Sequence, residues 1–176
     1  MVSADRLFAP QHYAPGGVMG RMRLGLVVVA FLVAGLGWAA ETGPVKPTPT
    51  DKCPVCGMFV AKYPDFVAEI LFKDGSYAVF DGMKDMFKYY FDMKKYEHSK
   101  SLSDIRSVQV TDYYSLSFVD GYAAFYVLGS DVYGPMGREF IPFGKEAEAR
   151  QFMTDHHGKA ILKFGEITRE MIEKMD

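Results

Sequence analysis

The first half of the chain alternates apolar and polar positions in a pattern that predicts a β-hairpin, a helix and a further strand. Residues 66–72 (FVAEILF) and 77–80 (YAVF) are typical of two strands joined by the turn sequence KDGS. In residues 82–92 apolar side chains recur every three or four positions, which indicates a helix with Asp81 as its N-cap. Residues 105–111 alternate again and predict the closing strand of this unit.

The second half repeats the same order of elements. The expected elements are strands at 122–128, 138–143 and 160–164, a loop at 129–137, a helix at 145–156 and a short terminal helix at 167–174. We therefore predict an α+β fold made of two tandem ββαβ units, at residues 52–115 and 116–176.

The N-terminal region has the pattern of an export signal. Two arginines precede an uncharged apolar run at 24–38, which is shorter than the roughly 20 residues of a comfortable membrane span. We expect cleavage after Ala39 or Ala40, with an uncleaved anchor as the alternative, so residues 1–40 form a leader. The three prolines of residues 41–51 predict an extended linker. The expected location is the periplasm or the outer face of the cytoplasmic membrane, with membrane association through the N-terminal segment.

Charge and composition exclude several classes of protein. Residues 1–40 contain three of the 20 basic and one of the 22 acidic residues, so the exported chain carries a net charge of −4 and is not suited to nucleic acid. The aromatic content of 15% is enough for a packed core. Because the sequence contains no nucleophile–base arrangement or phosphate loop, we do not expect an enzyme. Four acidic residues are interpreted as capping and turn residues: Asp81, Asp85, Asp120 and Asp131.

Both cysteines of the chain lie in the motif CPVCGM at residues 53–58. A disulfide between Cys53 and Cys56 would close almost no loop and would add little stability. A redox pair normally begins a helix, whereas glycine follows Cys56 directly. A structural zinc site needs four ligands, and the adjacent His156 and His157 are a poor second pair because neighbouring helical residues point in different directions.

A soft-metal site fits the motif better than these alternatives. The thiolate of Cys56 and the thioether of Met58 are soft donors, which select Cu(I), and Cu(I) accepts two or three ligands. Gly57 allows a tight conformation between them. The competing interpretation is that Met58 only fills the core, as methionines usually do. Met136 lies in the turn sequence GPMG, where a side chain has little reason to be buried and can reach a bound ion.

In four ordered blocks, the sequence resembles the NosL family of exported copper-binding accessory proteins, from Cys53 to Ile172. The blocks are CPVCGMFV, FKDGSYAVFDGMKDMFKYY, GPMGREFIPF and GKAILKFGEIT. The resemblance implies a fold akin to organomercurial lyase, and Cu(I) bound by Cys56 and Met58. Met136 matches the methionine of the family's GPMG loop, and Cys53 is an extra ligand or a resolving thiol.

The resemblance also implies partners. These are a copper-receiving metalloenzyme, nitrous oxide reductase, and a membrane transporter complex. Many family members carry a lipid-modified cysteine directly after the signal, whereas here Cys53 follows an eleven-residue linker and there is no lipobox. Three alternatives stay open: a thiol–disulfide protein that uses Cys53 and Cys56, a generic soft-metal domain, and a structural partner of a membrane complex.

Overall fold

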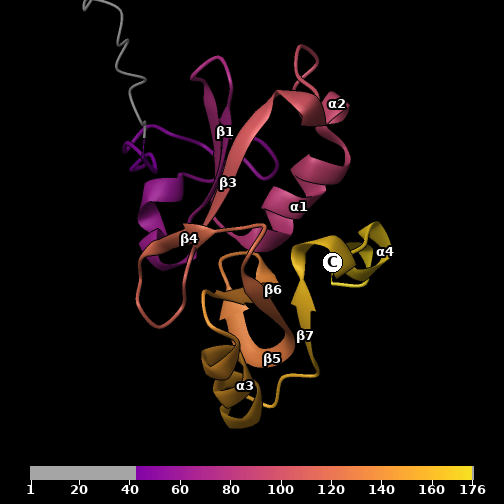
Figure 1. The fold of residues 1–176 in the computed structure, drawn as a ribbon. Coiled ribbons are helices and arrows are strands. Elements are labelled where there is room, and N and C mark those ends of the chain that lie inside the picture. The colour runs from indigo at the N-terminus through magenta and orange to yellow at the C-terminus, as the bar shows by residue number, and fades with distance from the viewer. Residues whose placement is uncertain (1–42, 176) are drawn as a thin grey trace, which may run out of the picture. The chain divides into compact units, whose positions relative to one another are not determined.

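A four-stranded antiparallel sheet forms the first half of the molecule (Figure 1). The computed structural model describes residues 43–175, so the predicted leader at 1–40 lies outside the described residues. The strands are β1 (Ala68–Phe72), β2 (Tyr77–Phe80), β3 (Ile105–Thr111) and β4 (Phe118–Asp120), in the order β2-β1-β3-β4. All five residues of β1 are buried, because this strand pairs with neighbours on both sides. The predicted hairpin and third strand are confirmed, and β4 was not predicted.

Two helices connect β2 to β3: α1 (Met83–Phe91) and α2 (Met93–Tyr96). The predicted apolar face of α1 is confirmed, with Met83, Met86 and Phe87 fully buried. The prediction that Asp81 is the N-cap was wrong. The N-cap is Gly82. In the first turn of α1, the backbone amide of Lys84 donates a hydrogen bond to the carboxylate of Glu139, which lies on a strand distant in sequence.

The second half contains a three-stranded antiparallel sheet with the order β6-β5-β7. Its elements are β5 (Phe125–Gly134), β6 (Gly137–Phe143), α3 (Glu146–Asp155) and β7 (Ala160–Lys163), followed by α4 (Arg169–Glu173). The order matches β2-β1-β3 in the first sheet, since in each case the first strand lies between its hairpin partner and the strand that follows the helix. The predicted α+β class is confirmed. Four 3₁₀ helices complete the described chain: Val60–Lys62, Pro64–Phe66, Leu102–Asp104 and Phe164–Glu166.

The loop predicted at 129–137 is largely a continuation of the two strands. The regular pairing ends at Leu128 and Phe140, and pairing resumes at Tyr133 with Arg138 and at Gly134 with Gly137. β5 therefore has an irregular stretch between Leu128 and Tyr133. The wrong prediction arose from the three glycines and the proline of this stretch, which here accompany an irregularity in the pairing and not its end.

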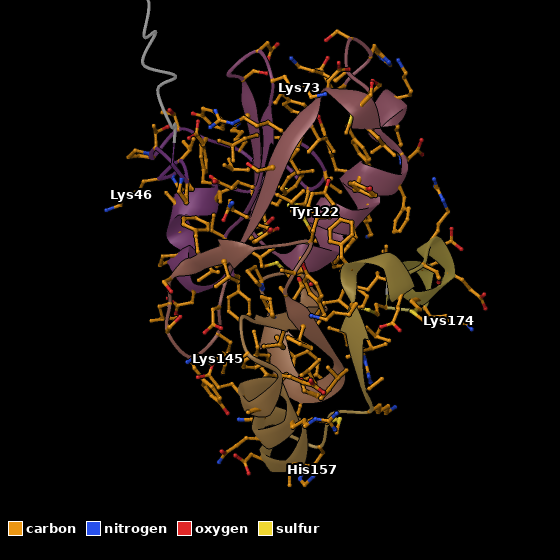
Figure 2. The ribbon with its side chains drawn as sticks, viewed as in Figure 1. Lys46, Lys73, Tyr122, Lys145, His157 and Lys174 are labelled. Carbon is orange, nitrogen blue, oxygen red and sulfur yellow. The ribbon has the colours of Figure 1, made fainter. Side chains whose placement is uncertain are left out.

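One large cluster of buried side chains joins elements of both halves. The ring of Phe87 on α1 lies 5.4 Å from that of Tyr126, 5.4 Å from Phe140 and 5.0 Å from Phe164, measured between ring centroids. A smaller cluster packs α3 on the second sheet through Phe143 and Phe152. Figure 2 shows lysines at the periphery, among them Lys46, Lys73, Lys145 and Lys174. Among residues 43–175, no helix has the length and apolar character needed to cross a membrane.

Candidate metal centre

The CPVCGM motif folds into a tight loop that a pair of backbone hydrogen bonds closes. The amide of Cys53 donates to the carbonyl oxygen of Met58 at 2.9 Å, and the amide of Gly57 donates to the carbonyl oxygen of Cys53 at 2.9 Å. Gly57 has φ +79°, a conformation that glycine adopts without strain. The motif alone predicts this tight conformation, and residues 53–58 will be called the thiol loop.

The thiol loop lies on the junction between β2 and α1, where two aspartates meet the two thiols. Cys53 Sγ donates to Asp85 Oδ2 at 3.4 Å, and Cys56 Sγ donates to Asp81 Oδ1 at 3.2 Å. One potential ligand atom from each of these four residues lies within 4.8 Å of the other three. Cys53 and both aspartates are buried, whereas Cys56 is partly exposed, so the cluster reaches the surface at Cys56.

Asp81 is not the N-cap, whereas Asp85 does lie in the first turn of α1; both also accept a hydrogen bond from a thiol, and sequence reasoning did not propose them as candidate ligands. A signal was present, because Asp81 follows a strand with a buried end and Asp85 lies one helical turn further along. The folded chain also brings four donors together, whereas the sequence alone offered no second pair of ligands for a tetrahedral ion.

Both thiols hold their protons at neutral pH. Burial raises the pKa of Cys56 to about 12; Asp85 and Asp81 also raise this pKa, while the backbone amide of Met58 lowers it. Burial likewise raises the pKa of Cys53 far above its usual range, against the opposing effect of the amides of Cys56 and Val55. A bound cation would replace these protons, because only the thiolate is a metal ligand.

Both cysteines are free thiols in the structure. Redox-active cysteine pairs have a lowered pKa on the attacking thiol, in an electropositive and partly exposed setting. Here burial and the neighbouring carboxylates shift both pKa values upward. The arrangement favours a metal-binding pair over a thiol–disulfide pair.

The two methionines predicted as ligands lie on different parts of the chain. Met58 is partly exposed and belongs to the thiol loop, two residues after Cys56. Met136 lies in the turn between β5 and β6, with 40% of its surface exposed. Its carbonyl oxygen accepts a hydrogen bond from Lys84 Nζ at 2.9 Å, and Lys84 directly precedes Asp85 on α1. Cys53, Cys56, Asp81 and Asp85 will be called the thiol cluster. The β5–β6 turn is therefore attached to α1, the helix that carries Asp85 of this cluster.

The other acidic and histidine candidates have local structural partners. Asp120 accepts a hydrogen bond from the amide of Tyr122, as a turn residue does. Asp131 Oδ1 lies 3.0 Å from Nδ1 of His156, the residue that follows α3.

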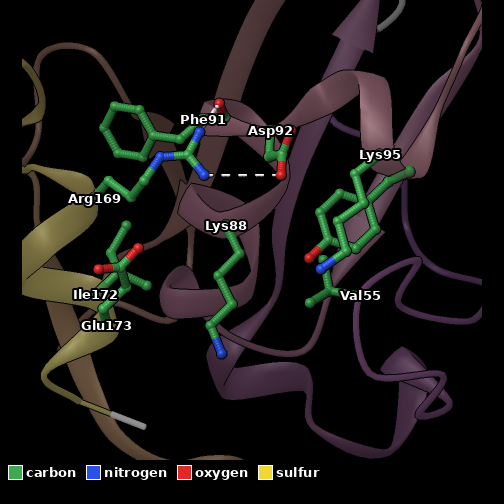
Figure 3. Close-up of a pocket in the computed structure, with 9 residues that line it drawn as sticks. Val55, Lys88, Phe91, Asp92, Lys95, Arg169, Ile172 and Glu173 are labelled. Atoms are coloured by element: carbon green, nitrogen blue, oxygen red, sulfur yellow. Dashed lines mark hydrogen bonds and ion pairs between the residues drawn. The ribbon is translucent and has the colours of Figure 1, made fainter.

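A pocket of about 350 Å³ borders the thiol loop at Val55 (Figure 3). The remaining lining comes from α1, α2 and α4, including Lys88, Phe91 and Ile172. Across it, Arg169 Nη1 of α4 lies 3.7 Å from Asp92 Oδ2 at the end of α1, and Figure 3 shows this pair at the pocket's edge. This pair links the C-terminal helix to the helix beneath the thiol loop.

Comparisons with known proteins agree with this architecture. The NosL family model matches residues 44–172. The copper-binding lipoprotein NosL of Stutzerimonas stutzeri is 28% identical over 160 residues, which cover 84% of this chain and 80% of the relative. The crystal structure of the copper chaperone NosL from Shewanella denitrificans superposes with a TM-score of 0.61 at 27% identity, covering 73% of this chain and 97% of that one. The chain belongs to the NosL family.

Proposed function

We propose that this protein is an exported copper chaperone that holds Cu(I) at the thiol loop and delivers it for the maturation of nitrous oxide reductase. One observation carries the proposal: two free thiols and two carboxylates lie within 4.8 Å of one another at a cluster that reaches the surface through Cys56. Two similar proteins are named a copper-binding lipoprotein and a copper chaperone. Catalysis is not part of this function.

The proposed primary ligands are Cys56 and Met58, with Met136 and Cys53 assisting. Thiolate and thioether sulfurs are soft donors that suit Cu(I), which accepts a low coordination number. Cys56 and Met58 are partly exposed and Met136 is exposed, so an incoming ligand from another protein can reach the ion at these positions. This exposure supports transfer by ligand exchange, in which the partner's donors replace those of the chaperone one at a time.

The proposed recipient is a copper metalloenzyme, nitrous oxide reductase, with a membrane transporter complex as a further partner. A location in the periplasm or on the outer face of the cytoplasmic membrane follows from the expected export signal. The relative from Stutzerimonas stutzeri is named a lipoprotein, whereas the first cysteine of this chain lies beyond a linker. We propose that membrane association comes from the N-terminal segment or from a partner. The likeness to organomercurial lyase that the family resemblance implies stays a prediction.

An anaerobic Cu(I) titration against a competing chelator tests the proposal. The reduced protein is compared with Cys56→Ser, Met58→Ala and Met136→Ala, and with Met153→Ala as a control methionine that packs in the cluster of α3. Loss of Cys56 should weaken binding by more than about 100-fold, because loss of a mere supporting residue already costs about 10- to 100-fold at metal sites. Met58→Ala should weaken binding by about tenfold or more.

Two results would count against the proposal. If wild-type protein binds Cu(I) weakly, the chaperone function fails. If binding is equally tight without Met58, the ion is held elsewhere, and the reduction potential of Cys53 and Cys56 becomes the property to measure. A parallel titration with Zn²⁺ separates Cu(I) selectivity from general affinity for cations at the thiols and carboxylates.

A further inference from the structure

Lys84 is a buried lysine whose side chain connects the two halves of the molecule. Only 3% of its surface is exposed. Its ammonium group donates to the carbonyl oxygen of Met136 at 2.9 Å and to that of Met175 at 3.5 Å. Its backbone amide donates to Glu139 Oε1 on β6 at 2.5 Å. Through backbone and side chain together, this single residue of α1 contacts β6, the β5–β6 turn and the C-terminal segment.

The position of Lys84 on α1 places it next to the thiol cluster. Asp85, the following residue, accepts the hydrogen bond from Cys53, and Asp81, three residues before Lys84, accepts that from Cys56. Residues 81–85, the junction between β2 and α1, therefore contact both cysteines and the backbone of Met136. A rigid helical turn transmits position accurately between two such contacts.

The β5–β6 turn needs such a contact because its own sheet holds it weakly. Between Leu128 and the pair formed by Tyr133 and Arg138, the pairing of β5 with β6 is irregular. Only two residue pairs close the hairpin beyond this irregularity, the second being Gly134 with Gly137. A short hairpin end of this kind is marginally stable by itself. The bond from Lys84 Nζ to Met136 is a specific constraint on the turn.

Burying an ammonium group is costly unless hydrogen bonds and nearby negative charge compensate. Lys84 has hydrogen bonds of this kind, because its ammonium group donates to the carbonyl oxygens of Met136 and Met175 at the point where α1 meets the Met136 turn. A leucine at this position would avoid the desolvation penalty but would leave the carbonyl oxygen of Met136 without this donor. The arrangement is thus better explained by positioning than by stability alone.

We propose that Lys84 is a positioning residue that holds the Met136 turn at the metal centre, so that the Met136 thioether completes the coordination of Cu(I). This inference rests on the proposed function, in which Cys56 and Met58 bind the ion. Lys84 itself does not contact copper. It acts through the backbone of Met136, and its contribution to affinity depends on the presence of that thioether.

A double-mutant cycle on the full chain tests this dependence. Cu(I) affinity is measured anaerobically by chelator competition for wild type, Lys84→Leu, Met136→Ala and the double variant. Each single substitution should weaken binding by about tenfold, as expected for a supporting residue and an assisting ligand, and the double variant should bind no more weakly than Met136→Ala. X-ray absorption should show the same loss of one sulfur neighbour of copper in Lys84→Leu as in Met136→Ala.

Lys163→Leu is the matched control. Lys163 also donates to two backbone carbonyl oxygens distant in sequence, those of Ala123 and Ala124, and within the described part of the chain its ammonium group has no hydrogen bond or ion pair with a residue of the proposed site. This variant should keep wild-type affinity. Lys84→Gln is the second test variant. The glutamine amide can donate a hydrogen bond, but the side chain is too short to reach the carbonyl oxygen of Met136 as the ammonium group does. It replaces Lys84→Leu in the cycle if the leucine variant does not fold, with the same expected result.

Three results overturn the inference. The first is unchanged affinity in the Lys84 variants. The second is independent losses, with the double variant weakened by about 100-fold, since additive effects would mean that Lys84 acts through general stability. The third is an unchanged number of sulfur neighbours in Lys84→Leu. Failure of the proposed function is a different outcome, because wild-type protein would then bind Cu(I) weakly or bind it as well without Cys56.

Discussion

The two strand-to-helix junctions of this protein have the same topology and opposite surroundings. In the first junction, residues 81–85, the chain leaves β2 after Phe80 and enters α1; in the second junction, residues 144–148, it leaves β6 after Phe143 and enters α3. Every residue of the first junction is buried, including two aspartates and a lysine. The second junction also carries charged residues, but none of its residues is buried.

The difference comes from what covers each junction. The thiol loop precedes β1 and contacts Asp81 and Asp85, while β6 supplies Glu139 to the start of α1. At the second junction the amide of Gly144 donates a hydrogen bond to Asp112 Oδ2, from the loop after β3. The first side chains of α3 lie in solvent. The repeated topology thus provides two equivalent junctions. Only the first, which the thiol loop covers, places buried charged residues beside soft sulfur donors.

The pH dependence of stability should separate the two junctions most strongly. Burial raises the pKa of Glu139 to about 8 from an ordinary value near 4.5. Between these values the folded chain keeps a proton that the unfolded chain loses, so this residue contributes stability below about pH 4.5, and that contribution is lost as pH rises towards 8. The loss is at most about 1.4 kcal/mol per pH unit.

Glu139→Gln should flatten this slope in urea unfolding measured from pH 5 to 8. Glu146→Gln, an exposed acid at the second junction, should leave the slope as in wild type. Equal slopes in all three proteins would mean that Glu139 is not protonated in the fold.

The glycines of the two junctions provide the next test. A Cβ at Gly82 would lie 2.2 Å from Glu139 Oε2, whereas a Cβ at Gly144 would lie 3.1 Å from its nearest neighbour, Val119 Cγ1, at an exposed position. Because Glu139 is buried and bonded, Gly82→Ala should lower the free energy of unfolding by about 1–3 kcal/mol, the usual cost of overpacking. Gly144→Ala should cost less. Thermal or urea unfolding measures both, and comparable losses would remove the steric distinction.

Copper affinity should respond to a carboxylate at the first junction only. Asp81 Oδ1 accepts a hydrogen bond from the Cys56 thiol, and its Oδ2 is buried with no hydrogen-bond partner among residues 43–175. Asp81→Asn should weaken Cu(I) binding by about tenfold, as loss of a supporting group does at metal sites. The apoprotein should be no less stable, because the substitution removes a partly unpaired buried carboxylate. Glu148→Gln at the second junction is the control, and an equal effect in both variants would argue against a role for Asp81.

The smallest effect belongs to the exposed pair on α3. Glu146 Oε1 lies 2.5 Å from Arg150 Nη2, one helical turn away, and both side chains are well exposed. Glu146→Gln should change the free energy of unfolding by less than about 0.5 kcal/mol, since exposed pairs of this spacing contribute little. A larger loss in urea unfolding would show that the second junction depends on charge as the first does.

Much of the fold could be predicted because its signals are local. The alternation of residues 105–111 and the spacing of Met83, Met86 and Phe87 follow from the periods of strand and helix, and both predictions are confirmed. The same patterns failed where the context was distant. Asp81 has the sequence position of a cap. The carboxylate that accepts a hydrogen bond from the first turn of α1 is instead that of Glu139, 55 residues after the donor Lys84.

The candidate site divides in the same way. The sequence by itself determined the thiol loop, because its residues are neighbours in the chain. The sulfur donors of Cys53, Cys56 and Met58 and the backbone freedom of Gly57 are evident without knowledge of the fold. Only the tertiary structure decided that Asp81 and Asp85 face the thiols, and that Lys84 connects this helix to the turn of Met136. Burial of these charged groups is offset by partners from other elements, and such contacts exist only once the two sheets and α1 have packed together.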